Sequence, residues 1–234
     1  MINISHLTRK FNENIAVDDL CLEIPDGSMF GFLGANGAGK TTTLKMMMGL
    51  LQPTSGTITI DGLNVSANPI LVKSKVGYLP DEVFIYDYLT GKQFLNFVAD
   101  VYSVDSKIKE EKIDDLLGSF GLKDAADEYT ANYSFGMKKK LALAGIVIHN
   151  PSLLILDEPF NGLDPQATKD FRNMLKKMSD KGTTVIFSSH VLEVVEKLVT
   201  HVAIINHGKL KICDSINNIM KNYESLEKAF FSFT

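Results

Sequence analysis

The sequence predicts an α/β fold whose sheet is mainly parallel and flanked by helices. Three apolar segments, residues 152–159, 183–190 and 202–206, show no polar alternation, which is typical of strands buried on both faces. Helical spacing separates them, in 166–182 and in 191–199. Strands and helices that alternate in this way form parallel sheets with helical crossovers.

The N-terminal part predicts short strands followed by a turn rich in glycine. Hydrophobic alternation favours strands at 1–7, 15–24 and 28–33, with turn residues between them. The last strand leads into glycines and then into a helix over 41–51 that ends near Gly49. Further along the chain, the pattern predicts a strand at 57–62, a short helix at 68–75 and a strand at 75–80.

Residues from about 84 to 150 predict a helical insertion. Helical spacing appears at 93–102, 108–120 and 137–148, with breaks at Gly118, Gly121 and Asn132. We therefore expect one domain over 1–234, with this helical segment inserted in its core.

Composition is that of an ordinary soluble protein, with a net charge of −4, 22% charged and 45% hydrophobic residues. This balance argues against a nucleic-acid partner. Cys21 and Cys213 lie far apart, which favours two buried thiols in a reducing compartment. The start of the chain resembles no secretion signal, and the longest apolar run, near 141–148, is too short to span a bilayer. We expect a cytoplasmic location.

The segment Gly34–Thr41, GANGAGKT, fits the phosphate-loop pattern G-x-x-x-x-G-K-[ST] between a strand and a helix. Glycines let successive backbone N–H groups point at phosphate oxygens, and the helix adds its positive end. Lys40 is expected to reach the β and γ phosphates, and the Thr41 hydroxyl to bind Mg²⁺. The alternative is a glycine-rich turn without a ligand.

The segment 152–159, SLLILDEP, ends a buried strand with two adjacent carboxylates. Mg²⁺ keeps several waters and takes one or two carboxylates, so Asp157 is a candidate metal ligand. Glu158 is expected to orient or deprotonate the attacking water. The alternative is a strand that ends in a polar turn.

Residues 133–145, YSFGMKKKLALAG, predict a helix whose start is capped by Ser134. Helix N-termini favour acids in the first turn, yet this one offers Lys138, Lys139 and Lys140 and no acid. This composition raises the question of which anion the helix start binds.

Taken together, these motifs resemble the nucleotide-binding subunit of ATP-binding cassette (ABC) transporters over essentially the whole chain. That family carries a signature usually written L-S-G-G-Q, and YSFGM at 133–137 occupies its place. Gly162, Leu163 and Asp164 resemble the aspartate-bearing loop of the family, and His190 resembles its histidine. The resemblance implies the ABC-type fold of phosphate-loop NTPases, with an antiparallel β subdomain at the N-terminus.

The resemblance also implies ATP and Mg²⁺ as cofactors and a dimer of two subunits, a homodimer in the first instance, that close head to tail on the nucleotide. Ser134, Gly136 and Asp164 would then bind ATP held by the partner's phosphate loop. For Lys139 and Lys140, a solvated lysine face is the favoured interpretation. The expected nucleotide-binding residues of the phosphate loop are Gly34, Asn36, Gly37, Ala38, Gly39, Lys40, Thr41 and Thr42.

Two aromatic or imidazole side chains complete the implied site. Phe11 resembles the residue that stacks on adenine, the alternative being a core or strand-edge aromatic. His190 resembles the histidine that contacts the γ-phosphate, so the expected catalytic residues are Glu158, His190 and Lys40.

Two positions depart from the family pattern. Phe135 replaces the first glycine of the signature, and we hypothesise that it slows turnover without abolishing it. Asp81 stands where the family commonly has a glutamine that binds Mg²⁺, so the expected metal ligands are Thr41, Asp81 and Asp157. Glu82 could substitute for Asp81, and an acidic surface turn is the alternative.

By resemblance, the helical segment after Asp81 is where a membrane permease docks, which would hold the subunit on the inner face of the membrane. Phe84, Tyr86 and Tyr88 would suit a docking groove, although core positions are an equal alternative. The C-terminal segment 223–234 resembles the tail of exporter ATPases, so export of an unknown substrate is expected. The alternatives are a soluble ABC protein acting on ribosomes or DNA and a regulator that binds ATP without useful hydrolysis.

Overall fold

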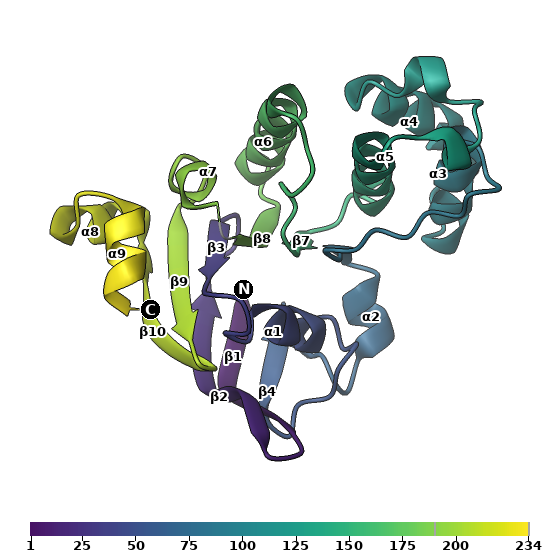
Figure 1. Ribbon diagram of the computed structural model, residues 1–234. Coiled ribbons are helices and arrows are strands. Elements are labelled where there is room, and N and C mark those ends of the chain that lie inside the picture. Colours follow the sequence, from purple (N-terminus) through teal and green to yellow (C-terminus); the bar gives the residue numbers. More distant parts are fainter. Residues whose placement is uncertain (190, 234) are drawn as a thin grey trace.

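The structure is a computed structural model that describes residues 1–189 and 191–233. It contains two sheets, and Figure 1 shows helices around them. The predicted fold class is confirmed: an antiparallel N-terminal sheet, a mainly parallel sheet flanked by helices, and a helical segment between β6 and β7.

The smaller sheet has the strand order β2-β1-β4-β5 and is antiparallel throughout. Its apolar side chains alternate with exposed ones, as expected for a sheet with one solvated face. Its strands are β1 (Ile2–Phe11), β2 (Asn14–Ile24), β4 (Ser55–Ile60) and β5 (Leu63–Asn64).

The larger sheet has the order β10-β9-β3-β8-β7-β6, in which only the edge strand β10 runs antiparallel to its neighbour. Strands β3, β7 and β8 are buried along their whole length because helices and the other sheet cover both faces. The strands are β3 (Met29–Leu33), β6 (Val76–Leu79), β7 (Leu153–Leu156), β8 (Thr184–Ser189), β9 (His201–Asn206) and β10 (Lys209–Ser215).

Helices fall into three groups. Beside the two sheets lie α1 (Lys40–Met47), α2 (Pro69–Lys73), α6 (Pro165–Asp180) and α7 (Leu192–Glu196). The helical segment holds α3 (Gly91–Val101), α4 (Ser106–Ser119), two short 3₁₀ turns (Lys123–Ala125 and Thr130–Asn132) and α5 (Phe135–Val147). The chain ends with α8 (Ile216–Asn222) and α9 (Leu226–Phe233), at the opposite end of the molecule from the helical segment (Figure 1).

Three apolar clusters stabilise this arrangement. One fills the space between the two sheets and includes Leu7, Phe30 and Met46. A second lies on the other face of the larger sheet, and a third joins α3, α4 and α5 around Leu95 and Leu141. The helical segment therefore has a core of its own.

Some predictions were wrong or incomplete. Strand β10 and helices α8 and α9 have no counterpart among the predicted elements. The sequence pattern of β10 is weak because it is an edge strand whose side chains are exposed or half-buried. Both cysteines are free but exposed, so the expectation of buried thiols is wrong. Within residues 1–189 and 191–233, no helix combines the length and apolar composition needed to cross a bilayer.

A glycine pair tests how closely the helical segment packs on the sheet. A Cβ at Gly77 in β6 would lie 2.5 Å from the Ile146 carbonyl oxygen of α5, whereas Gly118 in α4 has open space around it. We predict that Gly77→Ala lowers the free energy of unfolding by about 1–3 kcal/mol through overpacking. The control Gly118→Ala should raise it by about 0.5–1 kcal/mol, because alanine favours helix. Urea unfolding of both variants measures the difference, and equal midpoints would contradict the packing.

Candidate functional site: a phosphate loop beside two carboxylates

The phosphate loop lies between the end of β3 and the start of α1. Gly37 and Gly39 adopt φ angles of 79° and 107°, in the left-handed region that favours glycine. A Cβ at Gly39 would lie 2.4 Å from the Ala16 carbonyl oxygen, so this position excludes any side chain. The first turn of α1 has no side-chain cap and no acidic residue, which leaves backbone N–H groups for an anion.

Lys40 is held inside this loop. Its Nζ donates to the carbonyl oxygens of Gly34 at 2.7 Å and Ala35 at 3.2 Å, and its side chain is 7% exposed. Burial lowers the pKa of Lys40, and the carboxylates of Glu158 and Asp157 counter that effect. The ammonium is therefore positioned where an incoming phosphate would meet it.

A cavity of about 200 Å³ lies over the loop. It is lined by most of the predicted phosphate-loop residues, by the predicted metal ligand Asp81 and by the predicted base Glu158. Ala16 and Ala35 also line it. Ala35 belongs to the predicted loop 34–41, whereas nothing in the sequence pattern singled out Ala16. The predicted site residues that line this cavity are Asn36, Gly37, Gly39, Lys40, Thr41, Thr42, Asp81 and Glu158. Gly34 binds Lys40 through its carbonyl, and Ala38 is buried behind the loop.

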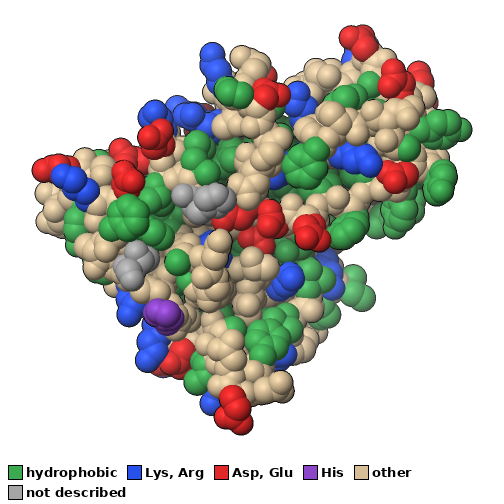
Figure 2. All heavy atoms as spheres, viewed as in Figure 1, with side chains coloured by type: hydrophobic (Ala, Val, Ile, Leu, Met, Phe, Trp, Pro, Cys, Tyr) green, Lys and Arg blue, Asp and Glu red, His purple; other side chains and the backbone are tan. Residues whose placement is uncertain are grey.

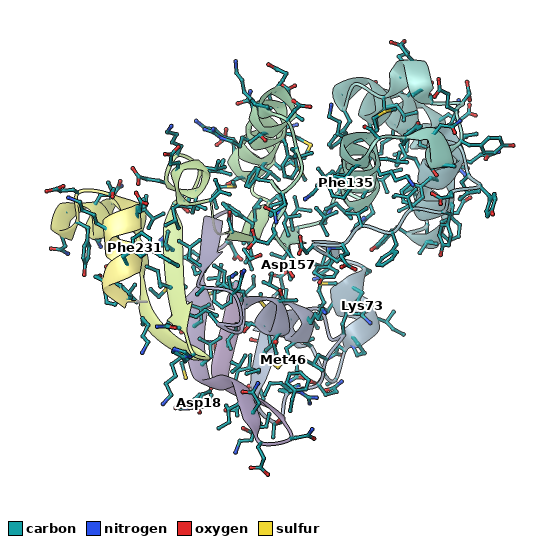
Figure 3. All side chains as sticks on the ribbon, in the orientation of Figure 1. Asp18, Met46, Lys73, Phe135, Asp157 and Phe231 are labelled. Atoms are coloured by element: carbon teal, nitrogen blue, oxygen red, sulfur yellow. The ribbon has the colours of Figure 1, made fainter. Side chains whose placement is uncertain are left out.

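The two carboxylates follow β7 directly. Asp157 is 1% exposed, and its Oδ1 accepts a hydrogen bond from the Ser188 hydroxyl at 2.6 Å. Glu158 Oε1 lies 4.0 Å from Lys40 Nζ, and the Glu158 residue has a left-handed φ of 46°. Figure 3 shows Asp157 near the middle of the molecule, and Figure 2 shows acidic side chains gathered at the centre of the same face.

The three predicted metal ligands share one cavity. Thr41, Asp81 and Asp157 all line a cavity of about 410 Å³ beside the phosphate loop, together with Glu82. A hydroxyl and carboxylates are the oxygen donors that Mg²⁺ prefers. The donor set therefore fits this ion.

Sequence reasoning missed Ser188. Its hydroxyl donates to Asp157 and accepts from the backbone N–H of Glu158 at 2.9 Å, so it orients the Asp157 carboxylate and holds the Glu158 backbone. The available signal was its position: β7 and β8 are parallel neighbours, and the ends of parallel strands meet at one edge.

The predicted partner-facing residues lie elsewhere. Ser134 caps α5, its Oγ accepting from the Met137 N–H at 3.2 Å, and Asp164 caps α6 by accepting from the Ala167 N–H at 2.7 Å. Neither they nor Gly136 line the cavity over the phosphate loop. One chain thus carries two separate groups of predicted nucleotide-binding residues.

Three further predictions have mixed outcomes. Phe11 is 42% exposed at the end of β1, outside the lining of this cavity, with the Arg9 guanidinium 4.4 Å from its ring. Lys139 is 1% exposed, so the interpretation of a solvated lysine is wrong for this residue. His190 lies outside the described residues.

Known proteins resemble this chain in sequence and in fold. A family model described as ABC transporter matches residues 17–161. Bacitracin transport ATP-binding protein BcrA of Bacillus licheniformis is 38% identical over 90% of this chain and 68% of its own length. A solved structure of an ATP-binding subunit of an ABC transporter superposes with a TM-score of 0.93 at 27% identity, covering 100% of this chain and 99% of that one.

A second solved structure, the dimeric post-hydrolysis state of an ATP-binding cassette bound to ADP and Pi, has a TM-score of 0.84. The two sequences are 20% identical, and the superposition covers 92% of this chain and 99% of the solved one. At this identity the likeness concerns the fold alone.

Ser188 provides a test of the metal site. Ser188→Ala removes the hydroxyl that orients Asp157, and such supporting groups are typically worth about 10–100-fold in metal affinity or activity. We predict that the Mg²⁺ concentration for half-maximal ATP hydrolysis rises by about tenfold or more. The control Ser152→Ala changes an exposed hydroxyl before β7 and should leave this concentration unchanged. If the two variants behave alike, the proposed support of Asp157 is wrong.

Proposed function

The chain belongs to the ABC transporter family, and we propose that it powers the export of a substrate through a separate membrane permease. It is an ATP-binding and ATP-hydrolysing subunit. The observation that most directly supports ATP binding and hydrolysis is the cavity over the phosphate loop, which Lys40, Thr41 and Glu158 line together.

In the proposed mechanism, the backbone of the phosphate loop and the Lys40 ammonium bind the β and γ phosphates of ATP. Thr41, Asp81 and Asp157 would hold Mg²⁺, which neutralises charge on the phosphates. Glu158 orients the attacking water and takes its proton. His190 is proposed to contact the γ-phosphate, and Phe11 to stack on adenine.

Two copies are proposed to close on ATP head to tail. The start of α5 is capped by Ser134 and has no acid in its first turn, which suits an anion. Because Ser134 and Gly136 lie outside the cavity of their own phosphate loop, that anion would be carried by the partner. The solved cassette bound to ADP and Pi shares this fold and is a dimer, which is a precedent for an assembly of two copies.

The permease is proposed to dock on the helical segment and so to hold the subunit at the membrane. An apolar cavity of about 260 Å³ lies between the end of β6 and helices α3 and α5, and Phe84 borders it. Phe84, Tyr86 and Tyr88 are 84%, 62% and 91% exposed, so none of them is a core residue in the free chain. An exposed aromatic group beside an apolar groove is typical of a protein-binding surface.

Export is supported by the relatives. BcrA is named for bacitracin transport, and another relative, YbhF of Escherichia coli, is named a probable multidrug transporter.

Purifying the tagged chain from membranes with its permease, and screening which compounds stimulate ATP hydrolysis, tests the proposal. Recovery of the chain without any membrane protein, together with full ATPase activity alone, would contradict it.

The proposed role of Glu158 predicts how the substitution Glu158→Gln changes ATP turnover. Glu158→Gln keeps the shape of the side chain but removes the base, so turnover should fall by about 10²- to 10⁴-fold. ATP binding should persist, and size-exclusion chromatography with MgATP should show a stable dimer. Unchanged turnover would remove Glu158 from this role.

Phe135 lies at the start of α5 and is 59% exposed. In the proposed dimer its ring stands beside the partner's nucleotide, so Phe135→Gly should raise the steady-state ATPase rate of the assembled transporter. A rate that is unchanged or lower would show that this ring does not limit turnover.

A further inference from the structure

Lys139 is a buried lysine that the proposed mechanism does not use. It lies in the first turns of α5 and is 1% exposed, whereas its neighbour Lys138 pairs with Asp87 at 2.6 Å on the surface. Burying an ammonium is costly unless hydrogen bonds compensate for the lost water. The contacts of Lys139 therefore indicate what its burial achieves.

The ammonium of Lys139 binds the backbone that follows β7. Its Nζ donates to the Glu158 carbonyl oxygen at 3.0 Å and to the Asn161 carbonyl oxygen at 2.7 Å. These two contacts span the segment that begins with the proposed base and leads to Asp164. Burial lowers the pKa of Lys139, while Asp81 and Glu158 act in the opposite direction.

Glu158 needs such support. Its left-handed φ of 46° is a conformation that residues other than glycine adopt only where the surroundings impose it. Ser188 accepts its N–H at 2.9 Å, and Lys139 donates to its carbonyl. The backbone on both sides of the Glu158 side chain is thus held, which fixes the position from which the carboxylate extends.

Phe135 makes a second contact between α5 and the same segment. A Cβ at Gly162 would lie 2.2 Å from Cε1 of Phe135, so the ring packs directly on this glycine of its own chain. Figure 3 shows Phe135 on the side of α5 that faces α6. The helix start and the segment 158–162 are joined at two independent points.

We propose that Lys139 is a positioning residue for ATP hydrolysis, which ties the water-activating Glu158 to the helix start that binds the partner's nucleotide. This inference rests on the proposed function of the site. When one copy closes on the partner's ATP, Lys139 would transmit the movement of the α5 start to Glu158. The position of the Glu158 carboxylate at the copy's own ATP would then change. The two nucleotides of a dimer would be coupled through Lys139.

The test is steady-state ATP hydrolysis with MgATP by the full chain purified together with its permease, measured for Lys139→Met, Lys139→Gln and the control Lys140→Met. Methionine keeps the apolar stem and removes all donors, so kcat should fall by about tenfold to a hundredfold, as expected when a reacting group is displaced. Glutamine retains a donor and should give an intermediate kcat. The ATP dissociation constant should stay within about twofold in all three variants, and Lys140→Met should retain wild-type kcat.

A double-mutant cycle with Glu158→Gln separates positioning from general damage. If Lys139 acts through Glu158, Lys139→Met should cause no further loss of turnover in the Glu158→Gln background. A loss of the same size in both backgrounds, or a kcat for Lys139→Met within twofold of wild type, would overturn the inference. Should the methionine variant fail to fold, the glutamine variant in the same cycle decides.

Two controls distinguish this inference from the proposed function. If the wild-type chain assembled with its permease does not hydrolyse ATP, or if Glu158→Gln retains full turnover in that assembly, the proposed function itself fails. If both controls behave as expected and the Lys139 variants remain fully active, only the role of Lys139 is rejected.

Discussion

The carboxyl edge of the parallel sheet is the constraint on which the candidate site depends. Strands β3 and β7 are separated in the sheet only by β8, so the residues that follow them meet at one edge. The phosphate loop follows β3 and the two acids follow β7, which places Lys40 Nζ 4.0 Å from Glu158 Oε1. Ser188, at the end of β8 between them, binds the Asp157 carboxylate and the Glu158 backbone N–H.

The second group of predicted nucleotide-binding residues depends on the helical segment. That segment has its own apolar core and carries Ser134 and Gly136 on α5, away from the cavity over the phosphate loop. Lys139 and Phe135 nevertheless join α5 to the segment after Glu158. The two predicted groups of nucleotide-binding residues are therefore separate within one chain, although α5 contacts the segment after Glu158 directly.

Much of this could be predicted from the sequence because the signals are local. The phosphate loop, the buried strand before Asp157 and the cap of α5 each depend on a few adjacent residues. Ser188, Ala16 and the contacts of Lys139 could not be predicted, since they arise from strands and helices brought together by the fold. Lys139 shows the difference clearly: within a run of three lysines, only tertiary packing determines which one is buried.

We propose that ATP is bound between the phosphate loop of one copy and the start of α5 of another. The crystal structure of Glu158→Gln with MgATP tests it most directly. We expect Ser134 and Gly136 of one copy to lie within hydrogen-bond distance of the γ-phosphate bound by the other copy's Lys40. ATP on the phosphate loop with residues 134–136 of every copy facing solvent would contradict it.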